Sequence, residues 1–366
     1  MGRYGIGFNF KGGFTTFPGT FTSINADNLD ARPVSPIGIV AILAEGGGFF
    51  PPGVATSVPI SVGSPRRFLS ESTLLTCAEL AVKPFAQIDR GAGQVIVVPV
   101  NQCTVATKTL NSSAPALLAT LSSKGWGTRF NAITVKAEAG KVTITLPTES
   151  GSIVESFSYT TVAGLVTALN ERSALVSAVF ALEGTPVTFD TTAMAGGTEP
   201  AATTDDWAAA LHALDGVRIT AVHVASYNPA VWALLADYAI QKRLRGFIGG
   251  DVQNWNGVTN RGIARAALAA QSNGLNAMRM MNCGLGANGL PAYKFAARYA
   301  ALAAALEPSV PMTFKHLDIE SLEARLDIQT EVGGVDGLLL AGVAVPVPDP
   351  DAPATFLLSR GLSTWI

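Results

Sequence analysis

Residues 38–44 read GIVAILA, and residues 94–100 read QVIVVPV. Both runs are continuous in apolar side chains, which is typical of strands buried on both faces of a sheet. Residues 70–83 lie between them and carry a helical stripe of leucines and alanines, with Ser70 and Ser72 as candidate caps. A helix that joins two such strands predicts a βαβ unit.

The same alternation returns in the second half of the chain. Strand patterns occur at 218–226, 246–249, 277–283 and 337–345, and helix patterns at 205–214, 229–243, 263–271, 291–306 and 319–326. Thr203 or Thr204 can cap the first of these helices, and Asn228 followed by Pro229 is typical of a helix start. We therefore expect an α/β core with a mixed sheet flanked by helices.

The middle of the chain has a different period. Residues 113–122 indicate a short Ala/Leu helix, and Gly125-Trp126-Gly127 then marks a turn. Residues 131–138 (NAITVKAE) and 141–146 (KVTITL) alternate apolar and polar side chains, which predicts a hairpin. Further patterns follow as a strand at 154–159, a helix at 162–172, and strands at 176–182 and 186–189. We interpret 125–195 as a small inserted α+β domain that splits the core into 36–124 and 196–345.

Both ends of the chain look like extended arms. Residues 1–35 are rich in Gly, Phe, Thr and Pro and have no helical period. An arm of this composition cannot bury its own aromatic side chains, among them Phe14, Phe17 and Phe21, so we expect it to dock on another surface.

The C-terminal arm, 346–366, begins with four prolines within 346–353. Proline cannot pair in the interior of a sheet, so this stretch predicts a stiff spacer. The apolar strand that follows contains Phe356, Leu357 and Leu358 and is suited to adding to a sheet edge of another copy. The alternative for both arms is local packing on the same subunit.

Composition excludes several partners and points to assembly. The 366 residues include 25 basic and 27 acidic side chains, a net charge of −2, which gives no electrostatic reason to expect nucleic acid. Only 14% of the residues are charged and 48% are hydrophobic, against about 25% charged in ordinary soluble domains. We expect no secretory signal and no membrane insertion, and free buried thiols at Cys77, Cys103 and Cys283.

Two patterns suggest chemistry, and each has a structural alternative. The histidines are His212, His223 and His316, and no serine lies in a nucleophile-type turn, so a serine protease is disfavoured. The loop from Gly284 to Gly289 (GLGANG) has the strand-loop-helix context of a dinucleotide site, but its glycine spacing matches loosely. An α/β enzyme or nucleotide-binding protein that uses this loop therefore stays open beside a simple structural turn.

Several short motifs in order resemble the tail sheath family of contractile bacteriophage tails. They are PGTFTSI at 18–24 before the 38–44 strand, AGQVIVVPVN at 92–101, GWG at 125–127 before NAITV, AGG at 195–197 followed by DW at 206–207, and SRGLST at 359–364. The resemblance covers most of the chain and rests on the order and spacing of these motifs.

The resemblance implies a structural subunit and no enzyme, without cofactor or metal. Such subunits form stacked hexameric rings around an inner tail tube protein, meet baseplate and tail terminator proteins, and drive tube ejection by contraction. Terminal arms would then complete sheets in neighbouring copies. It also suggests that the charged face of the helix expected at 319–326, with Glu320, Glu323 and Arg325, meets the tube; the alternative is a helix face that is simply solvated. The expected location is the virion tail, after assembly in the host cytoplasm.

Overall fold

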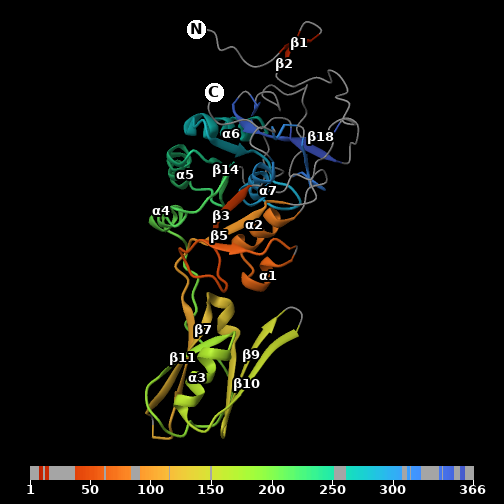
Figure 1. Cartoon of the computed structure of the whole chain (residues 1–366). Helices are drawn as coiled ribbons and strands as arrows, with labels where there is room; N and C mark the ends of the chain where they lie inside the picture. The colour runs from red at the N-terminus through yellow and green to blue at the C-terminus, as the bar shows by residue number, and fades with distance from the viewer. Residues whose placement is uncertain are drawn as a thin grey trace.

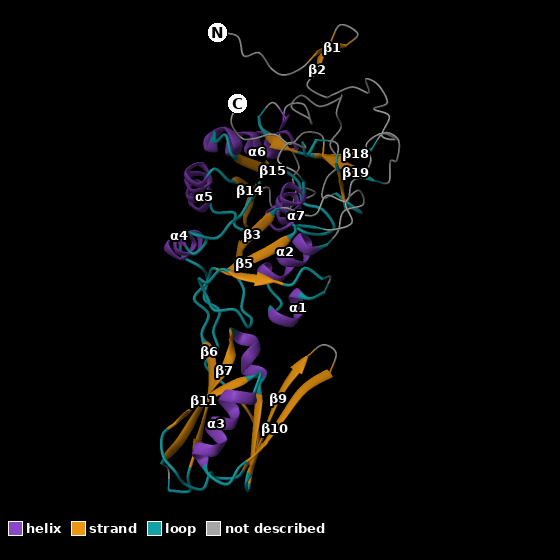
Figure 2. Cartoon of the chain, in the orientation of Figure 1, coloured by secondary structure: helices purple, strands orange, loops and turns teal. Residues whose placement is uncertain are grey.

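The chain folds into a larger core unit and a smaller unit that lie end to end (Figure 1). This computed structural model describes residues 8–10, 13–15, 38–61, 63–83, 91–114, 116–148, 151–250, 261–306, 311–313, 315–322, 338–339, 341–349 and 355–358. Helices cover the sheet of the core unit, whereas the smaller unit consists mainly of strands (Figure 2).

The core unit is built on a seven-stranded mixed sheet. Its spatial order is β17 (Val343–Ala344), β15 (Met280–Cys283), β14 (Arg245–Gly249), β13 (Ala221–Val224), β3 (Ile39–Ala44), β5 (Gln94–Pro99) and β4 (Thr56–Val58). All neighbours are parallel except β4, which pairs antiparallel with β5 at one edge. This arrangement confirms the expected α/β core.

Helices on both faces explain why the first strand is apolar throughout. Helices α2 (Thr73–Val82) and α7 (Ala292–Ala305) pack in one cluster with Val40 and Ile42 of β3. Helices α4 (Thr204–His212) and α5 (Pro229–Lys242) pack in another cluster with Ala41 and Leu43. Successive side chains of a strand point to opposite faces, so a sheet covered twice needs an uninterrupted apolar run. The remaining helices of the core unit are α1 (Pro65–Phe68) and α6 (Arg261–Leu275).

The caps of three helices match the expectation from sequence. The hydroxyl of Ser72 accepts the N–H of Leu75 at the start of α2, and the side chain of Asn228 accepts the N–H of Ala230 at the start of α5. At the start of α4, Thr203 and Asp206 form a reciprocal capping box.

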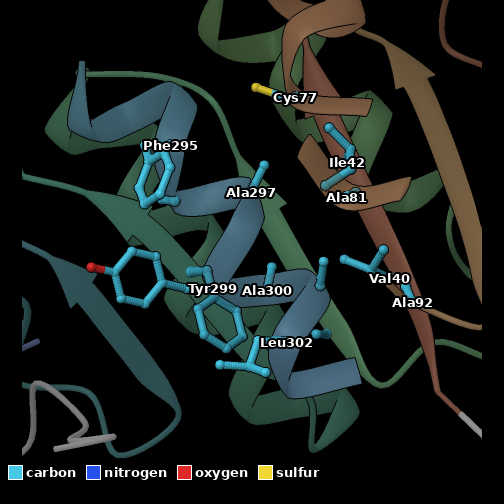
Figure 3. Packing of buried hydrophobic residues seen from close by; sticks show 14 of the residues in the cluster. Val40, Ile42, Cys77, Ala81, Ala92, Phe295, Ala297, Tyr299, Ala300 and Leu302 are labelled. Carbon is cyan, nitrogen blue, oxygen red and sulfur yellow. The ribbon is translucent and has the colours of Figure 1, made fainter. Parts of the chain in front are cut away.

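Helix α7 packs closely against the start of β3, where alanines of the helix face the sheet. Figure 3 shows Ala297 and Ala300 of α7 packed towards Val40 and Ile42 of β3 and towards α2. A Cβ atom at Gly38 would lie 1.9 Å from the backbone oxygen of Ala304, so only glycine fits where β3 begins. The close approach excludes water from the centre of the core unit.

The smaller unit consists of two antiparallel sheets and one helix around a single apolar cluster. One sheet has the order β10 (Gly151–Ser158), β9 (Lys141–Thr148), β8 (Thr134–Glu138) and β12 (Phe189–Ala193). The other has the order β11 (Val176–Phe180), β7 (Leu117–Trp126) and β6 (Val105–Asn111), and the elements between are α3 (Val162–Arg172) and the 3-10 turn η2 (Thr128–Ala132). The expected hairpin at 131–146 and helix at 162–172 are confirmed.

The expected helix at 113–122 is wrong, because most of this stretch belongs to strand β7. Strand β7 pairs with β6 on one side and with β11 on the other, and both ladders are antiparallel. Leu118 and Leu121 are buried in the cluster of the smaller unit together with Ala106. The smaller unit therefore begins at β6, earlier than residue 125.

Three chain segments meet where the two units join. Gly48 and Trp126 exchange both backbone hydrogen bonds, at 2.9 and 2.8 Å, which forms an antiparallel bridge between the units. The carboxylate of Glu199 accepts the N–H of Thr128 at 2.9 Å. Asn131 makes two further bonds, both of 2.8 Å, to the backbone of Gly197. The connection is thus hydrogen-bonded on several sides.

Candidate assembly surfaces

The last described strand of the chain pairs within its own subunit. Strand β19 (Phe356–Leu358) lies between β16 (His316–Leu317) and β18 (Pro346–Pro348), and both pairings are antiparallel. Phe356, Leu357 and Leu358 are all buried, with exposures of 2%, 8% and 0%. In the single chain these residues thus complete a sheet of their own subunit, which is the alternative of local packing.

The proline-rich stretch also differs from the expected spacer. Pro346 and Pro348 lie in β18, which pairs with β19. Strand β18 is at the edge of its sheet, where proline is tolerated because no donor is needed on the outer side. Residues 346–349 therefore fold onto the subunit, and the exchange of Phe356–Leu358 with another copy stays a prediction.

At the N-terminal end, β1 (Phe8–Phe10) and β2 (Gly13–Thr15) form an antiparallel pair in which Phe14 is opposite Asn9. Within the described residues this pair joins no other sheet. Phe17 and Phe21 lie outside the described residues, so the docking of the N-terminal arm also stays a prediction.

The segment that carries Glu320 is not helical in its described part. Residues 319–322 have no helical hydrogen bonds, and Leu322 forms an isolated bridge with Ala287. The side chain of Asn288 accepts the N–H of Glu320 at 2.7 Å and of Ser321 at 3.2 Å, so tertiary bonds replace helical ones. The helix expected at 319–326 is wrong over these residues. Glu320 is exposed, whereas Glu323 and Arg325 lie outside the described residues.

The glycine loop from Gly284 to Gly289 is a turn whose first four residues are buried. Leu285 and Ala287 are 1% and 0% exposed, and a Cβ at Gly284 would lie 2.5 Å from the side chain of Val343. The N–H of Ala287 donates to Leu290, and the N–H of Asn288 donates to Ser321. A phosphate-binding loop presents its N–H groups to the ligand, and here the chain itself uses two of them. This geometry favours the structural turn.

The three histidines are used structurally. His223 is fully buried on β13, its Nδ1 lies 3.1 Å from the carbonyl oxygen of Phe247, and burial lowers its pKa to about 4. His212 pairs with Asp215 on an exposed helix end, and His316 lies 3.3 Å from Asp349. The described residues contain no cluster of ligands that could hold a metal ion. The cysteines Cys77, Cys103 and Cys283 are buried thiols.

None of the described helices has both the length and the apolar character that crossing a bilayer requires.

A charged residue within the mostly buried helix α7 is central to this region. Arg298 of α7 is fully buried and donates to the carbonyl oxygens of Leu80 and Lys83 at 3.0 and 2.8 Å. It also donates to the carboxylate of Asp318 at 2.9 Å, and Lys83 forms a second ion pair with that carboxylate. Asp318 directly follows β16, so this cluster connects the C-terminal sheet to the core.

No protein-family model matches the chain, and no curated protein matches its sequence. Among the solved structures that match the fold are two sheath tail proteins, each with probability 1.00. A sheath tail protein from Desulfitobacterium hafniense matches with a TM-score of 0.64 and 15% identity, over 90% of this chain and 72% of that protein. A sheath tail protein from Listeria innocua matches with a TM-score of 0.64 and 16% identity, over 90% of this chain and 69% of that protein. The chain therefore has the fold of sheath tail proteins across both of its units.

Proposed function

We propose that this chain is a structural subunit of a contractile phage tail sheath and not an enzyme. The observation that carries the proposal is the fold similarity to sheath tail proteins over 90% of the chain. The low share of charged residues, 14%, agrees with a protein whose surface is largely covered by other copies. The buried glycine loop and the buried His223 offer no chemistry that competes with this role.

The partners in this proposal are other copies of the chain, in stacked hexameric rings, and an inner tail tube protein inside them. Baseplate and tail terminator proteins would close the two ends. The subunit would work without a cofactor, in the virion tail, after assembly in the host cytoplasm. Contraction would release energy stored in a less stable packing of the rings and drive the tube out.

Expression of the chain followed by size-exclusion chromatography and negative-stain microscopy tests the proposal. We expect rings or tubes, with or without a co-expressed tube protein. A compact monomer or dimer at every concentration and with every tail partner would contradict it.

The arms are tested by two truncations that the structure separates. Removal of 359–366 leaves β19 in place, whereas removal of 354–366 also takes away the buried Phe356 and Leu358. The second truncation therefore tests the exchange of Phe356–Leu358: we expect a monomer that does not polymerise, whereas the first truncation keeps this strand and serves as the control. A monomer is also expected after removal of 2–35. Tubes of normal length after removal of 354–366 and after removal of 2–35 would show that the arms are dispensable.

The tube-facing residues are tested by charge reversal at Glu320 and Glu323. Contacts between exposed charges set register and specificity more than affinity. We expect the doubly reversed chain to form sheath-like rings alone but not to enclose the tube. Normal co-assembly with the tube would remove these residues from the proposed interface.

A further inference from the structure

Arg298 is an exception on its helix. Twelve of the fourteen residues of α7 are buried, and Arg298 is the only charged one among them. A charged group without water is strongly unfavourable unless it is paired and hydrogen-bonded, so its position requires specific partners. Burial lowers the pKa of Arg298 to about 10, which still leaves the guanidinium charged at neutral pH.

The partners of Arg298 come from two other parts of the chain. One terminal nitrogen donates to Leu80 and Lys83, whose carbonyl oxygens lie at the C-terminal end of α2, where helical carbonyls lack partners within the helix. The other terminal nitrogen donates to Asp318. One side chain therefore joins α7, the end of α2 and the segment that follows β16.

Strand β16, which directly precedes Asp318, pairs with strand β19 on one side. Leu317 is opposite Phe356, and the N–H of Leu358 donates to Lys315 at 3.0 Å. On the other side of β19, β18 follows β17 after one residue, and β17 pairs with β15 through only two residue pairs. The C-terminal sheet thus has a covalent attachment to a short edge strand and a second attachment through Asp318.

We propose that Arg298 is the positioning residue that anchors the C-terminal sheet to the core, so that a load on β19 enters the core through α7 and α2. That a load acts on β19 depends on the proposed function, in which neighbouring copies pull on the chain ends. The anchoring by Arg298 does not depend on it, because it is a property of the single subunit. Asn288 supports it by donating to the carbonyl oxygen of Asp318 and accepting the N–H of Glu320.

Hydrogen exchange of the unassembled full-length chain tests the anchor. Arg298→Met removes the charge and keeps a long side chain, and Lys294→Met removes a partly exposed charge on the same helix as the matched control. With Arg298→Met we expect the amides of Ile319 and Leu358 to exchange about ten-fold faster, because local opening becomes easier. Amides of β9 in the smaller unit should not change, and Lys294→Met should match the wild type.

A uniform rise of exchange in all units, or no rise at 315–322 and 356–358, would overturn the anchor. If Arg298→Met does not fold, Asp318→Asn provides the second test. It keeps the bonds of Arg298 to α2 and weakens the links of Asp318 to Arg298 and Lys83, so it should increase exchange at Ile319 and Leu358 but not in the strands of the core sheet. Tube formation by the wild type is assayed in a separate experiment. If the variants open locally as expected but the wild type forms no tubes, the anchor is kept and the sheath function is rejected.

Discussion

The side-chain amide of Asn170 is hydrogen-bonded at both of its ends to the backbone of Ala178. Nδ2 donates to the carbonyl oxygen at 2.9 Å, and Oδ1 accepts the N–H at 2.8 Å. Ala178 lies on β11, the outer strand of its sheet, and the hydroxyl of Ser173 accepts the N–H of Val176 on the same strand. Side chains of the preceding helix and turn thus close a sheet edge that would otherwise offer free backbone groups.

Loss of the hydrogen bonds that cover this sheet edge is predicted to make the smaller unit prone to aggregation. Asn170→Ala loses two hydrogen bonds, which lowers the free energy of unfolding by about 1–3 kcal/mol. It also uncovers the edge beside Val179 and Phe180, whose side chains are already 69% and 42% exposed. We expect faster aggregation on mild heating, measured by light scattering. Glu171→Ala, at an exposed neighbouring position, is the control, and equal scattering by the two variants would contradict the role of Asn170.

Substitution by alanine at two glycines should change the free energy of unfolding in opposite directions. Gly38→Ala places a Cβ 1.9 Å from the backbone oxygen of Ala304, and backbone on both sides leaves little room to adjust. We expect a loss of about 1–3 kcal/mol or more from overpacking. Gly274 lies in helix α6, and nothing beyond its own stretch of helix lies within 4 Å of its Cβ position, so Gly274→Ala should gain up to about 1 kcal/mol from helix propensity. Denaturant unfolding of both variants measures these changes; a harmless Gly38→Ala would disprove the close contact.

Continuous apolar runs and helix caps made the core unit predictable. The runs that became β3 and β5 are apolar throughout because helices cover both faces of the sheet. Ser72, Thr203 and Asn228 mark helix starts through local hydrogen bonds, which depend on neighbouring residues only. Such signals need no knowledge of the tertiary structure.

The errors occurred where distant partners decide the structure. The Ala/Leu stretch at 113–122 has good helix formers, but ladders to β6 and β11 hold it as strand β7. The β-branched residues of 104–109 (TVATKT) favour a strand and are the sequence signal for β6, the strand that pairs with β7. At 319–322, bonds to Asn288 outweigh helix propensity, and nothing local in the sequence indicates this partner.

At the candidate assembly surfaces, too, local features could be predicted from the sequence and long-range contacts could not. Phe356–Leu358 was recognisable as a strand, but its partners β16 and β18 are set by the tertiary fold. Arg298 and its acceptor Lys83 are 215 residues apart in sequence, so their contact could not be predicted from spacing. Lys294 and Arg298 are both charged residues of α7, and their positions in the sequence alone do not indicate that only Arg298 is buried.

His223 is predicted to make the stability of the core depend on pH. Burial lowers its folded pKa to about 4, from an ordinary value of 6.5. As the pH falls from 6.5 towards 4, the unfolded chain binds a proton that the folded chain does not bind. The free energy of unfolding therefore falls by about 3 kcal/mol across this window and loses nothing more from this group below it.

His223→Gln keeps a donor for the carbonyl oxygen of Phe247 but does not titrate. Urea unfolding between pH 7 and pH 4 should then show a weaker loss of stability for the variant than for the wild type. Parallel pH profiles would show that His223 does not remain neutral in the folded core.

Glu199 is predicted to keep the two units in a fixed orientation. Its carboxylate accepts both the N–H and the hydroxyl of Thr128, at 2.9 and 3.2 Å, across the junction that Gly48 and Trp126 bridge. Glu199→Ala removes both bonds, a loss of about 1–3 kcal/mol, whereas Glu199→Gln keeps an oxygen acceptor in place. We expect the alanine variant to broaden the range of distances between the units and the glutamine variant to preserve it.

The distances can be measured with spin labels at Ser152→Cys in the smaller unit and Gln241→Cys in the core unit, both exposed positions. The native cysteines do not compete for the label, because burial raises the pKa of Cys77 and Cys103 to about 12 and that of Cys283 well above its ordinary value. A narrow distribution in the alanine variant would mean that the remaining contacts, the Gly48–Trp126 bridge and the bonds of Asn131, hold the junction without Glu199. A broad distribution in the wild type would contradict a fixed orientation altogether.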